Sequence, residues 1–264
     1  MKRTARRKNV LRIVFVPVLL AVALLAFAGG IVSGKSGAPN RDRTNHSAAS
    51  VLNSSPMESV LPTGPANIPV SDEPVSEEEN WALMLVNWEH PLPDGFSVPE
   101  LTQLRNGHAV DSRAYPALQA MMDGARAAGL QPLICSSYRT RDVQERLFEQ
   151  EVQNWTDQGY IREEATDRAA MWVARPGTSE HQTGLAVDIV DMSYQLLDER
   201  QENTPVQKWL MDHCAEYGFI LRYPADKSAL TGINYEPWHY RYVGTEAARE
   251  IMENGWCLEE YLLR

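Results

Sequence analysis

Two segments, far apart in the chain, combine histidine with carboxylate side chains. The first holds His181 and Asp188 with Gly184 between them, and the second holds Glu236 and His239. A catalytic zinc ion takes three protein ligands and keeps one position for water, and two imidazoles with one carboxylate meet that need. Glycine at position 184 allows a turn that would point both side chains of the first segment at one place. The residue types therefore predict a zinc site formed by His181, Asp188 and His239.

Strand periodicity gives two of these side chains a common orientation. Residues 184–190 are rich in β-branched residues and alternate, which predicts a strand. Because successive side chains point to opposite faces of a strand, Asp188 faces away from its apolar neighbours, which are Leu185, Val187 and Ile189. A second strand is predicted over residues 238–243, and there the alternation places His239 opposite to Trp238. Both polar side chains are thus expected to face a cleft, with the apolar ones in the core.

Glu236 lies shortly before His239 and is followed by a proline. Zinc lowers the pKa of its bound water to about 7. A carboxylate near that water can take its proton during attack and deliver it to the leaving amine. We therefore expect Glu236 to act as the catalytic acid and base without binding the metal. Asp191, past the end of the strand, is assigned no such role.

A hydrogen-bonded surface cluster without a metal is the competing interpretation. Either segment alone would be weak support for a metal, and the two together favour one. The remaining histidines lie in a linker, in loops or in a helix and are assigned no role: His46, His90, His108 and His213. The three cysteines form no C-x-x-C pair, so a cysteine zinc site is not predicted. We interpret them as buried thiols, with one disulfide as the alternative.

Three motifs in order along the chain resemble the VanY-type D-alanyl-D-alanine carboxypeptidases, a family that also includes L,D-carboxypeptidases of bacterial cell walls. The resemblance covers residues 82–255. It is carried by Ser136-Ser137-Tyr138-Arg139-Thr140, by Ser179-x-His181-x-x-Gly184-x-Ala186-x-Asp188, and by Glu236-Pro237-Trp238-His239. One departure is Ser137, where the family often has glycine. The stretch Trp155–Arg175 looks like a variable insertion.

The resemblance implies one zinc ion per chain, held by His181, Asp188 and His239, with Glu236 as acid/base. It also implies that Arg139 stabilises charge on the attacked carbonyl oxygen or holds the substrate, for which a permanently charged guanidinium is suited. Ser179 and Gln144 match family positions that contact substrate. Tyr138, also assigned to substrate binding, and Trp238 are interpreted as packing residues that line the cleft.

The function implied is removal of the terminal D-alanine from peptidoglycan stem peptides or their precursor. Three alternatives remain: an L,D-carboxypeptidase, an endopeptidase on the same polymer, and a non-catalytic wall-binding module. No sequence feature predicts an oligomeric state. The full set of metal and base residues disfavours the binding module.

The elements expected around the site indicate an α+β domain with a small antiparallel sheet flanked by helices. Residues 81–87 are expected to form a strand or a short helix. Helices are predicted over residues 114–128, 141–154, 162–173 and 204–217, and a last helix with Thr245 as its N-cap. Strands are predicted over residues 132–138, 184–190 and 238–243. Helices that precede interleaved strands disfavour a parallel βαβ series.

Charge and hydropathy place this domain after an N-terminal segment of another kind. The chain has a net charge of −10, yet all charged residues within 1–35 are basic. The acidic remainder disfavours a nucleic-acid partner, which would need clustered Lys and Arg. Residues 13–32 are uncharged and long enough to cross a bilayer. Their basic flank predicts a cytoplasmic N-terminus and an extracytoplasmic body.

We therefore expect three parts: residues 1–35 as basic flank and transmembrane anchor, residues 36–80 as a disordered linker poor in large apolar residues, and residues 81–264 as the peptidase domain. The expected location is the bacterial cell membrane, crossed once, with the catalytic domain outside. Cleavage of a signal peptide after an A-x-A pattern at Ala26 to Ala28 is the alternative, which gives a secreted protein.

Overall fold

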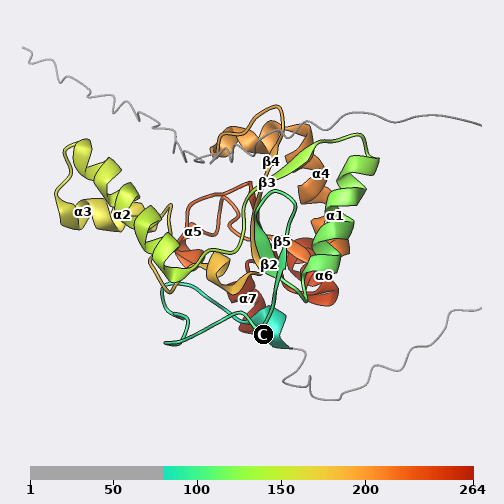
Figure 1. Ribbon diagram of the computed structural model, residues 1–264, viewed down its shortest axis with the longest axis horizontal. Coiled ribbons are helices and arrows are strands. Elements are labelled where there is room, and N and C mark those ends of the chain that lie inside the picture. The colour runs from blue at the N-terminus through green and yellow to red at the C-terminus, as the bar shows by residue number, and fades with distance from the viewer. Residues whose placement is uncertain (1–79) are drawn as a thin grey trace, which may run out of the picture. The chain divides into compact units, whose positions relative to one another are not determined.

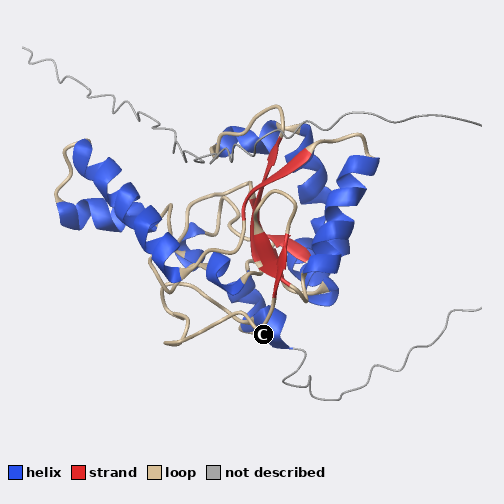
Figure 2. Cartoon of the chain, in the orientation of Figure 1, coloured by secondary structure: helices blue, strands red, loops and turns tan. Residues whose placement is uncertain are grey.

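The computed structural model describes residues 80–264, so the predictions for the basic flank, the span over residues 13–32 and the linker lie outside the described part. Within residues 80–264, no helix has both the length and the apolar character needed to cross a bilayer. The α+β class is confirmed, because an antiparallel sheet is flanked by helices (Figure 1, Figure 2).

The main sheet has four strands in the order β3-β4-β6-β5, all antiparallel to their neighbours. Its strands are β3 (Pro132–Ser136), β4 (Ala186–Asp191), β5 (Phe219–Leu221) and β6 (His239–Tyr242). A smaller antiparallel pair consists of β1 (Leu101–Gln103) and β2 (Ala109–Asp111). Every residue of β4 is buried, which follows from its central place and its β-branched sequence.

The α-helices are α1 (Tyr115–Ala127), α2 (Arg141–Asp157), α3 (Arg162–Ala170), α4 (Pro205–His213), α5 (Ser228–Thr231), α6 (Thr245–Asn254) and α7 (Leu258–Leu262). Single 3-10 turns are η1 (Asn80–Leu83), η2 (Glu180–Thr183), η3 (Glu199–Asn203) and η4 (Cys214–Tyr217). The hairpin of α2 and α3 extends away from the sheet in Figure 1 and has a small apolar core of its own.

The largest apolar core lies on one face of the main sheet. There Val187 and Ile189 of β4 pack with Leu118 of α1 and Leu210 of α4. Burying such side chains is the main stabilising contribution in a domain of this size. Because strand residues alternate, Asp188, between the two apolar residues of β4, points to the other face, where the candidate site is formed.

Several local predictions need correction. The helix expected over residues 204–217 is divided into α4 and η4. The N-cap of α6 is Gly244, with φ of 85°, and Thr245 is the first helical residue. The segment after residue 80 forms the 3-10 turn η1, the helical alternative. Strands β1, β2 and β5 have three residues each, too few for an alternation pattern to be visible in the sequence.

The three cysteines are all free, so the disulfide alternative is wrong. Cys214 and Cys257 are buried and Cys135 is partly buried. Burial raises the pKa of the Cys214 thiol to about 12 and that of the Cys257 thiol to about 11. Thiols with such pKa values are protonated at neutral pH and unreactive.

Candidate metal centre

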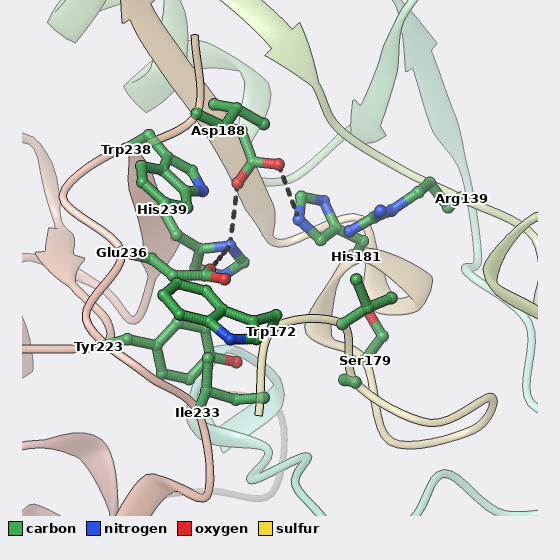
Figure 3. Close-up of a pocket in the computed structure, with 13 residues that line it drawn as sticks. Arg139, Trp172, Ser179, His181, Asp188, Tyr223, Ile233, Glu236, Trp238 and His239 are labelled. Atoms are coloured by element: carbon green, nitrogen blue, oxygen red, sulfur yellow. Dashed lines mark hydrogen bonds and ion pairs between the residues drawn. The ribbon is translucent and has the colours of Figure 1, made fainter. Parts of the chain in front are cut away.

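Asp188 and His239 meet because β4 and β6 pair in one register. The two residues are direct partners in the antiparallel ladder, and the Asp188 Oδ1 atom lies 3.0 Å from His239 Nδ1. Side chains of directly opposed residues stand on the same face of a sheet. Figure 3 shows both side chains pointing into the same cavity.

His181 reaches this face through a tight turn. It lies in η2, and Gly184 then adopts a left-handed conformation with φ of 73° that leads into β4. A Cβ atom at Gly184 would lie 2.8 Å from the backbone nitrogen of Asp111, so a side chain would collide there. Position 184 requires glycine for two reasons, which are the positive φ and the close approach of the β2 backbone.

Two contacts orient the imidazole of His181. Its Nδ1 lies 2.8 Å from the Ser137 carbonyl oxygen, which can only accept a hydrogen bond, so Nδ1 carries the proton. Its Nε2, directed into the cavity, lies 3.3 Å from Asp188 Oδ2. The register of β3 against β4 shifts between Ile134 and Ser136, and such irregularities commonly redirect the chain beside functional sites.

The three predicted metal ligands therefore converge. One ligand atom from each of His181, Asp188 and His239 lies within 4.8 Å of the others. The two imidazoles meet edge to face with ring centroids 4.8 Å apart, and all three side chains are buried. Two nitrogen donors and one carboxylate oxygen on rigid elements fit zinc, and they leave one side of the group open to the cavity.

The charges in this cluster are strongly perturbed. Burial, helped by the positive charge of Arg139, lowers the pKa of His181 to about 4. Burial opposes a charge on His239, but the hydrogen bond to Asp188 and the nearby carboxylate of Glu180 outweigh it and raise the pKa to about 9. Burial likewise opposes a charge on Asp188, yet the two histidines hold its pKa well below the ordinary value. The carboxylate is thus ionised and available to a cation.

Glu236 lies beside the cluster. Its Oε2 is 3.7 Å from His239 Nδ1, and a turn closed by the His239 amide donating to the Glu236 carbonyl connects the two residues. Burial raises the pKa of Glu236 to about 8 in the metal-free protein. A carboxyl group that titrates near neutral pH is matched to general acid and base work.

Arg139 lines the same cavity from the loop between β3 and α2. Its backbone amide donates to the His181 carbonyl, which ties this loop to η2. Within residues 80–264 the guanidinium has no ion pair, and its buried Nε has no hydrogen-bond partner. Burial lowers the pKa of Arg139, yet guanidinium stays charged in proteins, so this cation is free to meet an anionic ligand.

Of the three other residues predicted to contact substrate, one lines the cavity and two do not. Ser179 is buried and lines the cavity. Gln144 does not: its side chain is fully buried, and its amide donates to the Ala174 carbonyl at 2.7 Å. Tyr138 also lies outside the lining, and its backbone amide donates to the Ala109 carbonyl. Gln144 and Tyr138 are therefore not among the residues that line this cavity, and Gln144 fixes the loop that contains Ala174.

The sequence interpretation missed several lining residues, which are Trp172, Val173, Ala174, Leu197, Tyr223 and Ile233. Trp172 and its two neighbours come from the end of the predicted insertion, which therefore contributes to the cavity. Trp238 lines the cavity, as its interpretation as a cleft-lining residue predicted. Its expected orientation opposite to His239 does not hold, because β6 begins at His239 and strand alternation does not extend to residue 238. An aromatic residue in a loop is the one sequence property that could have indicated Trp172.

Comparison with known proteins decides the family. Residues 107–245 match the family model of the D-alanyl-D-alanine carboxypeptidase VanY. The chain belongs to the VanY family. A D-alanyl-D-alanine carboxypeptidase of Enterococcus faecalis is 46% identical over 187 residues, which are 70% of this chain and 67% of that protein.

Two solved VanY structures resemble the described VanY domain. One is a Glu-to-Ala variant from a VanB-type resistance cassette in complex with Zn(II), and the other is VanYB in complex with D-alanine-D-alanine. Both are 46% identical with a TM-score of 0.64 and cover 69% of this chain, and the match spans 99% and 98% of the two solved chains. The VanY fold and the enzyme class of this chain, a metallo-carboxypeptidase, are thereby shown.

Proposed function

We propose that this VanY-family chain is a zinc-dependent D-alanyl-D-alanine carboxypeptidase that removes the terminal D-alanine from peptidoglycan stem peptides. The observation that carries the proposal is the convergence of His181, Asp188 and His239 on one point beside Glu236 and Arg139. The zinc complex and the D-alanine-D-alanine complex of the two VanY relatives support the same metal and substrate.

Each residue of the site has its own role in the proposed reaction. His181, Asp188 and His239 would hold zinc, which when bound acidifies water and polarises the scissile carbonyl. Glu236 takes the proton of the attacking water and delivers it to the nitrogen of the departing D-alanine. The Arg139 guanidinium donates hydrogen bonds to the oxygen on which negative charge develops, a preorganised electrostatic contribution that costs no reorganisation.

Digestion of defined muropeptides tests the proposal. The full-length protein should convert a pentapeptide stem to a tetrapeptide and free D-alanine, detected by mass spectrometry, and a chelator should abolish the conversion. Intact pentapeptide in the presence of zinc contradicts the proposal. Conversion of tetrapeptide to tripeptide, or cleavage of a cross-linked dimer in preference to the pentapeptide, assigns the L,D-carboxypeptidase or endopeptidase alternative to the same site.

We also propose that the catalytic domain acts outside the cytoplasmic membrane, anchored by residues 13–32. The uncharged run and the basic flank before it support this topology. The full-length protein should sediment with membranes and be digested by protease added to intact spheroplasts. Recovery of a shortened protein in the medium indicates the cleaved-signal alternative, and protection from the protease contradicts both.

A further inference from the structure

Glu180, between Ser179 and His181, has a side chain that is excluded from solvent and faces a buried pair of arginines. Its Oε1 accepts hydrogen bonds from Arg222 Nε at 2.7 Å and from Arg241 at 2.8 Å. Both arginine side chains have no exposed surface, nor does that of Glu180. A buried carboxylate held by two guanidinium groups stays ionised, because protonation would remove negative charge that balances these buried cations.

The second carboxylate oxygen of Glu180 faces the candidate metal ligand His239. Glu180 Oε2 and His239 Nε2 lie 3.6 Å apart, slightly beyond hydrogen-bond distance. Within the described residues, both atoms are buried and have no hydrogen-bond partner. Buried polar atoms rarely remain unsatisfied, and two that face each other across this distance satisfy one another by a small approach.

The opposite edge of the same imidazole faces the site. His239 Nδ1 lies 3.0 Å from Asp188 Oδ1 and 3.7 Å from Glu236 Oε2, so Nδ1 is the nitrogen directed at the other predicted ligand and the predicted base. An imidazole bound to a metal through one nitrogen keeps its proton on the other, and a carboxylate at that second nitrogen fixes both the tautomer and the ring.

We propose that Glu180 is the positioning residue of the metal centre: it accepts the Nε2 proton of His239 and thereby presents Nδ1 to zinc. His181 uses the opposite arrangement, since its Nδ1 proton is directed at the Ser137 carbonyl and its Nε2 faces the site. The inference rests on the proposed zinc site and adds a residue for which the sequence interpretation gave no role.

The same network connects the ligand to both ends of the described domain. Arg222 donates two hydrogen bonds to Glu259 of α7, at 2.7 Å and 2.9 Å. Arg241 donates to the carbonyl oxygens of Ala82 and Met84, near the start of the domain. Two arginines and two glutamates balance in charge, so Glu180 is held in place without a proton.

Zinc affinity measured on paired variants tests this role. In Glu180→Gln, the amide oxygen must accept the hydrogen bonds that the arginines donate. The amide NH2 group then faces the Nε2–H group of His239, and two donors cannot form a hydrogen bond with each other. Glu259→Gln removes one negative charge from Arg222, which also pairs with Glu180, but Glu259 does not contact His239. Loss of such a ligand partner costs 10- to 100-fold in metal affinity. We expect that loss for Glu180→Gln in a chelator competition assay, and a change of less than threefold for Glu259→Gln.

Equal zinc affinity in Glu180→Gln and the wild type would overturn the inference, as would an equal loss in the Glu259→Gln control. Thermal unfolding of the zinc-free variants separates a positioning effect from general destabilisation. If the wild type binds no zinc at one equivalent, the proposed function fails; if it binds and the variants do not differ, only the role of Glu180 fails.

A measurement on the wild type alone tests the inference even if the Glu180→Gln protein does not fold. In the zinc-loaded wild type, nitrogen–proton correlation spectra of the imidazoles should show His239 as the Nε2–H tautomer and His181 as the Nδ1–H tautomer. An Nδ1–H signal assigned to His239 would contradict the inference directly.

Discussion

Asp188 and His239 are paired residues of adjacent strands, and their side chains touch at 3.0 Å across the β4–β6 ladder. Asp188 also contacts His181 at 3.3 Å, so one carboxylate joins the two motifs of the site. Replacing it with asparagine keeps its size but removes the charge that a divalent cation requires. We expect Asp188→Asn to lose the one equivalent of zinc retained by the wild type after dialysis, as measured by elemental analysis.

Asp191 offers the matched control for that variant. It lies at the end of the same strand, is also buried, and accepts hydrogen bonds from the backbone amide and hydroxyl of Ser193. Asp191→Asn should keep its zinc. If both variants retain zinc equally, Asp188 is not a ligand.

Gly184 should tolerate no side chain. An alanine there would have a positive φ, which costs about 1–2 kcal/mol, and its Cβ would collide with the Asp111 backbone. Gly129 has φ of 82° and open space around its Cβ position, so Gly129→Ala has the conformational cost alone. We expect a loss of unfolding free energy of about 2–5 kcal/mol for Gly184→Ala, since overpacking adds about 1–3 kcal/mol to the conformational cost. Urea denaturation compares the two variants, and equal losses would show that the close approach of β2 is unimportant.

Glu236→Gln should separate catalysis from metal binding. Glutamine keeps the shape of the side chain but cannot take a proton, and general acid–base catalysis contributes about 10²–10⁴-fold. We expect kcat on a pentapeptide stem to fall by about that factor, while zinc content stays at one equivalent. Loss of zinc together with activity would instead identify Glu236 as a ligand.

The zinc-free protein should become less stable as pH rises toward 8, and Glu236 should be one cause. Burial raises its pKa from 4.5 to about 8, so the folded protein binds this proton more tightly than the unfolded chain does. Folding then takes up a proton between these values, and unfolding free energy falls with pH by at most about 1.4 kcal/mol per pH unit. The stability of Glu236→Gln relative to wild type should therefore increase from pH 5 to pH 8 in chelator-treated samples. A difference independent of pH would contradict this prediction.

Arg139→Lys should test the geometry of the cation rather than its charge. Lysine keeps the positive charge but loses the planar fork of donors. If Arg139 stabilises the developing oxyanion, kcat should fall by roughly 10²-fold with a smaller change in KM. Arg141→Lys, an exposed neighbour, is the control and should change neither value. A rise in KM alone would assign Arg139 to substrate binding instead.

The sequence by itself determined the chemistry of the centre and the local direction of its side chains. Residue types specified the donor set, and strand alternation placed Asp188 opposite to Val187 and Ile189, because the period of a strand depends only on the local backbone. The helices and strands with clear periodicity were predicted to within a few residues, and the ordered motifs alone indicated the VanY family.

Only the tertiary structure decided which distant groups meet. The pairing of Asp188 with His239 depends on the register between two strands, and Gly184 is constrained by the backbone of β2. No local sequence pattern predicts that Glu180 contacts His239 and two buried arginines, because ion pairs between distant segments produce no periodicity in a sequence. Packing within residues 80–264, which excludes water from these groups, also sets the pKa values that the proposed catalysis requires.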